Sequence, residues 1–61
     1  MFSKGVDKKK AKELIEVAIK ETENKFDRAY ATGLIEMAYE LGAITMNERA
    51  DYKSELYKLK I

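Results

Sequence analysis

The chain has 61 residues, of which 38% are charged and 46% are hydrophobic, and its formal net charge is +1. This length allows one domain, and this composition excludes both a disordered chain and a membrane-spanning one. Cysteine and histidine are absent, which excludes disulfides, thiolate metal sites and the commonest general base. We therefore expect a single helical domain over residues 1–61, with no enzyme activity, no cofactor and no metal site.

The first helix is predicted over residues 8–23, after a loose basic leader at residues 1–6. Asp7 is the predicted N-cap, because its carboxylate can accept from the free amides of the first turn. The inward positions recur at three- and four-residue spacing and are Ala11, Leu14, Ile15, Ala18, Ile19 and Thr22. Since no signal-peptide core follows Met1, the expected compartment is the cytoplasm.

The central element is a helix predicted over residues 25–41. Its polar residues recur every four positions and form one stripe that we expect to be exposed: Arg28, Thr32, Glu36 and Glu40. A broad apolar face comprises Phe26, Ala29, Tyr30, Gly33, Leu34, Met37, Ala38 and Leu41, with Ala31, Ile35 and Tyr39 beside it. Since a surface helix usually has an apolar stripe of roughly 100°, this helix needs neighbours on at least two sides.

Two joints divide the chain. Asn24 is predicted to cap the central helix, with Asp27 imitating a capping box. Gly42 is the predicted left-handed residue after that helix, and Thr45 and Glu48 match a capping box at the start of a helix over residues 46–60. The third helix is expected to turn Tyr52, Leu56 and Leu59 inward. These elements predict an all-α fold, a compact three-helix bundle.

The helical spacing of the apolar residues continues without a shift across the joint at Asn24, and this continuity supports a second interpretation. In that alternative, one long helix over residues 8–41 and an antiparallel helix over 46–60 assemble as a dimer, because a single rod cannot bury its own apolar stripe.

The candidate interface consists of Ala29, Gly33, Ile35 and Tyr39. Ala29 and Gly33 allow another helix to approach closely, and this helix belongs either to the same chain or to a partner. Tyr39 and Ile35 form a second stripe, which either lies at an interface or covers the first or third helix. Glu36 and Glu40 are interpreted as a solvated stripe rather than a catalytic pair.

A candidate basic patch comprises Lys4, Lys8, Lys9, Lys10 and Lys12. These lysines could contact nucleic acid nonspecifically, which makes a nucleic-acid-associated regulator the alternative function. A helix-turn-helix at Gly42 is disfavoured, because Glu48, Asp51 and Glu55 would face the phosphates. No membrane and no small-molecule substrate are expected as partners.

The residues Ala38-Tyr39, Leu41-Gly42 and Ile44-Thr45, followed by Glu48, give the chain a general resemblance to short helical proteins of Gram-positive bacteria and their phages. The resemblance covers about half the chain and implies a small accessory or regulatory protein that binds another protein. The predicted function is therefore a non-enzymatic helical interaction or regulatory module that associates with itself or modulates a host protein.

Overall fold

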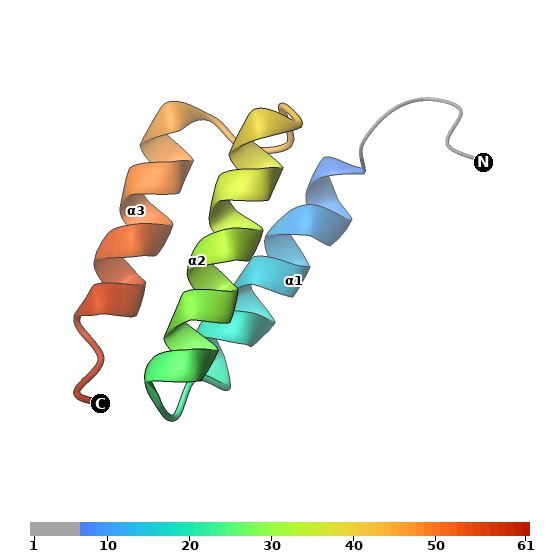
Figure 1. The fold of residues 1–61 in the computed structure, drawn as a ribbon. Coiled ribbons are helices and arrows are strands. Elements are labelled where there is room, and N and C mark those ends of the chain that lie inside the picture. The colour runs from blue at the N-terminus through green and yellow to red at the C-terminus, as the bar shows by residue number, and fades with distance from the viewer. Residues whose placement is uncertain (1–6) are drawn as a thin grey trace.

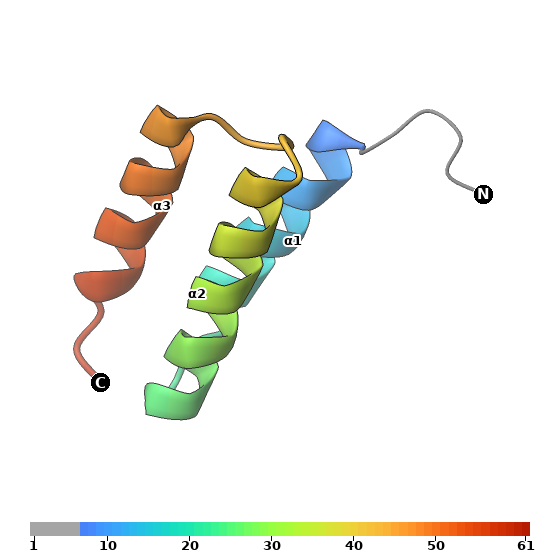
Figure 2. The same cartoon turned by 45° about the horizontal axis from the view of Figure 1, so that its top comes forward.

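The computed structural model describes residues 7–61, and the leader predicted at residues 1–6 lies outside this range. It contains three helices, α1 (Lys8–Lys20), α2 (Lys25–Glu40) and α3 (Met46–Tyr57), and no strand within residues 7–61. The helices lie side by side with α2 in the middle (Figures 1 and 2), and all three contact one another. The predicted all-α three-helix bundle is confirmed.

The joint between α1 and α2 is a true break, so the structure does not contain the single helix considered over residues 8–41. Asn24 caps α2 as predicted, because its Oδ1 accepts from the backbone N–H of Asp27 at 2.9 Å. Asp27 in turn accepts from the N–H of Glu23 at 3.0 Å. The hydroxyl of Thr22 donates to the carbonyl of Ala18 at 2.7 Å, and α1 ends at Lys20 instead of residue 23.

The joint between α2 and α3 follows the predicted pattern. Gly42 has a φ of +79°, in the left-handed region that an L side chain resists. Its N–H donates to Tyr39 at 3.0 Å, and the N–H of Ala43 donates to Ala38 at 2.8 Å, which together make a Schellman motif. Thr45 and Glu48 form the predicted reciprocal capping box, with bonds of 2.8 and 3.1 Å.

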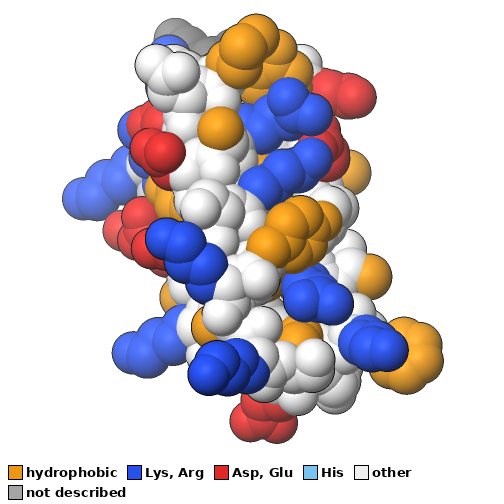
Figure 3. Space-filling view, turned by 90° about the vertical axis from the view of Figure 1, so that its left-hand side faces the viewer, with side chains coloured by type: hydrophobic (Ala, Val, Ile, Leu, Met, Phe, Trp, Pro, Cys, Tyr) orange, Lys and Arg blue, Asp and Glu red, His pale blue; other side chains and the backbone are white. Residues whose placement is uncertain are grey.

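The third helix is short and mostly polar. Leu56 is its one fully buried residue, while Tyr52 and Leu59 are partly buried against the core, which agrees with the predicted inward face. The helix ends at Tyr57 instead of residue 60. Figure 3 views the molecule from the α3 side and shows Lys and Arg side chains along much of that surface. With Leu56 as its one buried residue, α3 offers little apolar area to its neighbours.

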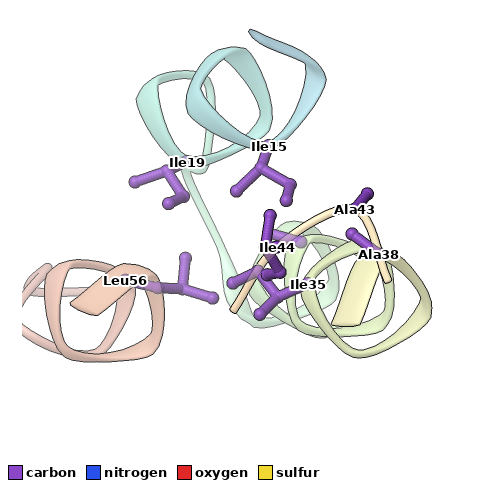
Figure 4. Packing of buried hydrophobic residues seen from close by; sticks show 8 residues of the cluster. Ile15, Ile19, Ile35, Ala38, Ala43, Ile44 and Leu56 are labelled. Atoms are coloured by element: carbon purple, nitrogen blue, oxygen red, sulfur yellow. The ribbon is translucent and has the colours of Figure 1, made fainter. Parts of the chain in front are cut away.

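The core lies where the three helices meet and is built from small and branched aliphatic side chains. Figure 4 shows Ile15 and Ile19 pointing from α1 and Leu56 pointing from α3 towards Ile35 and Ile44 at the centre. The complete buried cluster is Ile15, Ile19, Ala31, Ile35, Ala38, Ala43, Ile44 and Leu56.

The rotation of α2 about its own axis differs from the sequence prediction. Ala31, Ile35 and Ala38 form its buried face, although Ala31 and Ile35 were expected to flank the main one. Most of the broad apolar face is exposed instead, with Phe26 86% and Met37 61% accessible. The predicted exposed polar stripe was wrong for three of its four residues, and Glu40 alone is exposed. Arg28, Thr32 and Glu36 are half-buried beside α3. Arg28 and Thr32 contact Tyr57, and Glu36 pairs with Arg49 and Lys53.

The two glycines next to and within α2 allow a matched test of backbone conformation. Gly42→Ala is expected to lower the free energy of unfolding by about 1 kcal/mol, because alanine resists a positive φ. Gly33→Ala is expected to raise it by about 0.5–1 kcal/mol, because Gly33 is helical and an added Cβ meets no atom within 4 Å.

Urea denaturation followed by circular dichroism, at the lowest practical protein concentration, measures both changes. If Gly42→Ala were neutral or stabilising, the left-handed turn would be wrong.

Candidate interaction surface

An exposed apolar surface, which we name the α1–α2 face, runs along α2 and onto α1. Its members are Leu14, Phe26, Tyr30, Gly33, Met37 and Leu41. Successive helical residues are rotated by about 100°, so the four α2 residues and the C-cap residue Leu41 fall on one side of that helix. The five side chains that are not glycine are each more than half exposed. An apolar surface of this extent on a small chain is typical of an interaction site.

A groove lies within this face between α1 and the C-terminal half of α2. Its volume is about 150 Å³, and its walls include Ala11 and Leu14 on one side and Leu34, Met37 and Leu41 on the other. All of the residues that line it are apolar. The groove therefore suits a hydrophobic side chain and offers no polar group to orient a small-molecule substrate.

Gly33 lies in the middle of α2 and on the α1–α2 face. No helix of the described chain packs against it, since a Cβ built there has no neighbour within 4 Å and the residue is exposed. Close packing inside the chain, which was one interpretation of Ala29 and Gly33, is therefore not what the structure shows. Ala29 is exposed as well. An interior helical glycine costs about 1 kcal/mol relative to alanine, and nothing in the described fold accounts for that cost.

Ile35 and Tyr39, the other two candidate interface residues, pack inside the bundle. Ile35 is 0% exposed and belongs to the core, so it cannot form part of an external surface in this fold. Tyr39 is half-buried against the core, and the guanidinium of Arg49 lies 4.9 Å from its ring centroid. The structure thus corresponds to the alternative in which this stripe covers the neighbouring helices, and the four candidate residues do not share one surface.

The sequence pattern identified the residues of the α1–α2 face as apolar but predicted internal packing for most of them. The signal that they stay exposed is the composition of α3, which contributes one buried residue, Leu56. A helix with so few apolar residues cannot cover the second side of α2.

Charged groups join α2 to α3. The carboxylate of Glu36 accepts from Arg49 Nε at 3.1 Å and pairs with the ammonium of Lys53. These hydrogen bonds, first that of Lys53 and then that of Arg49, hold the pKa of Glu36 below its usual value. A carboxylate held ionised in this way has no proton to give near neutral pH, so Glu36 is not suited to general-acid catalysis.

Glu48 joins α3 to α1. One of its oxygens closes the capping box with Thr45, and the other lies 2.7 Å from Lys12 Nζ. The bond from Lys12 is the main reason, and that from the Thr45 N–H the second, that the pKa of Glu48 is lowered. Sequence patterns did not reveal these pairs, because their members come from different helices.

Tyr52 is the other link between α3 and α1. Its hydroxyl donates to Glu16 Oε2 at 3.0 Å. Burial, together with this bond to a carboxylate, raises the pKa of Tyr52 to about 12. The side chain therefore stays neutral and donating well above the range in which a free tyrosine ionises.

The structure describes four of the five lysines of the candidate basic patch, and these four spread over more than half of the circumference of α1. Lys8, Lys9 and Lys10 are exposed on consecutive positions of the first turn of α1, so they point in directions about 100° apart. Lys12 is half-buried and engaged with Glu48, and Lys4 lies outside the described residues. Lys10 therefore points away from Lys8, and Lys12 is engaged by a carboxylate, so binding of nucleic acid by this patch stays a prediction.

Within residues 7–61, no helix has the length and apolar character needed to cross a membrane, and no cluster of metal-ligating side chains is present. Comparison of the chain with protein-family models, with curated proteins and with solved structures found no match.

Acid should weaken the links made by Glu36 and Glu48. Both pKa values are lowered in the folded protein. The two ionised carboxylates therefore contribute to the free energy of unfolding above about pH 4.5, and this contribution is lost as the pH falls through their pKa values in the folded protein. Glu36→Gln should lower stability at pH 7 and reduce the further loss between pH 5 and about pH 3.

Urea midpoints across this pH range test the expectation, with Asp51→Asn on the exposed part of α3 as the control. An acid-dependent loss of stability as large in the Glu36→Gln variant as in the unmodified protein would contradict it.

Alkali should act through Tyr52. The pKa of Tyr52 is raised from 10.0 to about 12 in the folded protein. The neutral hydroxyl therefore makes its full contribution to the free energy of unfolding below pH 10, and this contribution is lost as the pH rises towards 12. Tyr52→Phe should cost about 1 kcal/mol near neutral pH by removing the bond to Glu16, and should flatten the stability profile above pH 10.

Tyr30→Phe, at an exposed tyrosine, is the matched control. Equal alkaline slopes in the Tyr52→Phe variant and the unmodified protein would disprove the assignment.

Proposed function

We propose that this chain is a small non-enzymatic helical module that acts by binding protein through the α1–α2 face. The single observation that carries the proposal is the exposure of the apolar residues of α2, with Phe26 86%, Tyr30 67% and Met37 61% accessible. In a chain of 61 residues, which can bury only about 60% of its unfolded surface, leaving such side chains in water forfeits stabilisation. Covering them with another protein recovers it.

The residue types on the face support this proposal. Aromatic residues and methionine are enriched in protein interfaces, and charged residues are depleted at interface centres. Phe26, Tyr30 and Met37 follow this composition, and Gly33 lies among them. An accessory or regulatory role, which the resemblance to short helical proteins of Gram-positive bacteria and their phages implies, would rest on such binding.

A photo-crosslinking experiment in the cells that encode the chain tests the proposal without a prior choice of partner. Tyr30→benzoylphenylalanine places the probe in the face, and Asp51→benzoylphenylalanine places it on exposed α3. We expect a protein adduct from position 30 and not from position 51. Adding Met37→Glu should reduce the adduct at least tenfold, because a buried charge replaces a central contact.

Met46→Glu is the matched control, since Met46 is 63% exposed but begins α3 and lies outside the face. Absence of an adduct at position 30, or one that Met37→Glu leaves unchanged, would disprove the proposed function.

A further inference from the structure

We propose that the α1–α2 face is covered by a second copy of this chain, bound antiparallel, with Phe26 of each copy in the apolar groove of the other. This inference rests on the proposed function and names its partner. It is carried by four features of the described residues: a protruding side chain (the knob, Phe26) with a groove of matching size, a glycine between them, complementary charges and the available area.

The knob and the groove lie at opposite ends of the same helix. Phe26 is in the first turn of α2 and is the most exposed large hydrophobic residue of the described chain. The groove is lined by Met37 and Leu41 from the last turns of α2, together with Leu14. About 1.5 Å of rise per residue puts Phe26 about 12 Å along α2 from Leu34, the nearest lining residue of that helix, and about 16 Å from Met37. The side chain of Phe26 therefore cannot fill the groove of its own chain.

The groove has the size of an aromatic ring. Its volume is about 150 Å³, and an apolar cavity of about 150 Å³ in another protein binds benzene. A twofold axis across the middle of α2 exchanges the two ends of the helix, so each Phe26 would reach the groove of the other copy. Such an interface is isologous and closes at two copies.

The middle of α2, where the twofold axis would pass, is Gly33. A Cβ at this position would have no neighbour within 4 Å in its own chain, which leaves room for a second helix. Two helices that cross at glycine approach more closely than at a larger residue. Within the proposed dimer, Gly33 therefore has a packing role that the single chain does not give it.

The charges at the ends of α2 favour the antiparallel orientation. Lys25 begins the helix and Glu40 ends it, both are exposed, and neither forms an ion pair with a described residue. Fifteen positions of about 100° put them about 60° apart around α2, on the same edge of the face. Antiparallel pairing sets Lys25 of one copy beside Glu40 of the other at both ends. Parallel pairing would set like charges together and would align the helix dipoles unfavourably.

The area is sufficient for a reversible dimer. Aromatic side chains bury about 150–250 Å² each when fully covered. With half to nine-tenths of each side chain exposed, Leu14, Phe26, Tyr30, Met37 and Leu41 together offer on the order of 600 Å² per copy, near the lower end of stable interfaces. We therefore expect association that depends on protein concentration in the micromolar range.

Sedimentation of the purified full chain over a concentration series is the first test. We expect a monomer–dimer equilibrium that Phe26→Ala weakens at least tenfold, whereas Met46→Ala at an exposed position outside the face has no effect. Lys25→Glu and Glu40→Lys should each weaken the dimer, and the double variant should restore it. Lys58→Glu, on the α3 side, is the charge control. Circular dichroism verifies that each variant remains folded.

Cysteine crosslinking determines the orientation, because the natural chain has no cysteine that could interfere. Lys25→Cys and Glu40→Cys proteins, mixed and oxidised, should form a mixed disulfide dimer. Neither protein alone should crosslink, because the two ends of α2 are about 22 Å apart and a disulfide requires Cα atoms within about 7 Å.

Self-crosslinking of the Lys25→Cys protein would show a parallel dimer and overturn the proposal. A dimer that Phe26→Ala and Lys25→Glu leave unchanged would overturn it as well. If the chain is monomeric at every concentration, the proposed dimer is wrong, but the proposed function is not yet contradicted. The proposed function is then tested by whether position 30 forms an adduct with a different protein in cells.

Discussion

Burial of Ile35 where α1 and α3 meet α2 is the packing interaction on which the rest of the structure depends. Ile35 is 0% exposed, and Ala31 and Ala38 lie beside it on the same buried face of α2. Once this face is turned inward, the opposite side of α2 must face water. The exposure of Phe26 and Met37 is therefore the direct consequence of how the core is packed.

The core also explains why α3 is held by polar contacts. Leu56 is the one residue of α3 that is fully buried, so the remaining attachment comes from ion pairs and hydrogen bonds at the edges. Glu36, Glu48 and Tyr52 each reach a neighbouring helix. Partly exposed pairs of this kind contribute modestly to stability, but they fix which side of α3 faces α2.

The exposed α1–α2 face and the small core both follow from the short length of the chain. A chain of 61 residues that has no cysteine, and no cluster of metal-ligating side chains within residues 7–61, has few ways to gain stability apart from association. Placing aromatic and methionine side chains outside the core reduces the stability of the single chain and increases the stabilisation available on binding. Gly33 has the same effect, because it weakens an isolated helix while it permits close contact with another.

The sequence by itself determined the helices and the joints between them. Asp7, Asn24, Gly42 and the Thr45–Glu48 capping box are local signals, because each acts on backbone groups only a few positions away. Such contacts form in almost any tertiary context, and for this reason they could be predicted. Helix ends without a clear stop signal, at Lys20 and Tyr57, were predicted less well.

The tertiary structure alone decided which side of α2 faces its neighbours. Two apolar faces were available on this helix, and the broader one stayed exposed. The choice depends on what α1 and α3 can offer: branched aliphatic residues that interlock with Ile35, and Arg49 and Lys53, which pair with Glu36. These contacts join residues distant in sequence, and periodicity within one helix contains no information about them. The position of the α1–α2 face was therefore decided by side-chain fit between helices.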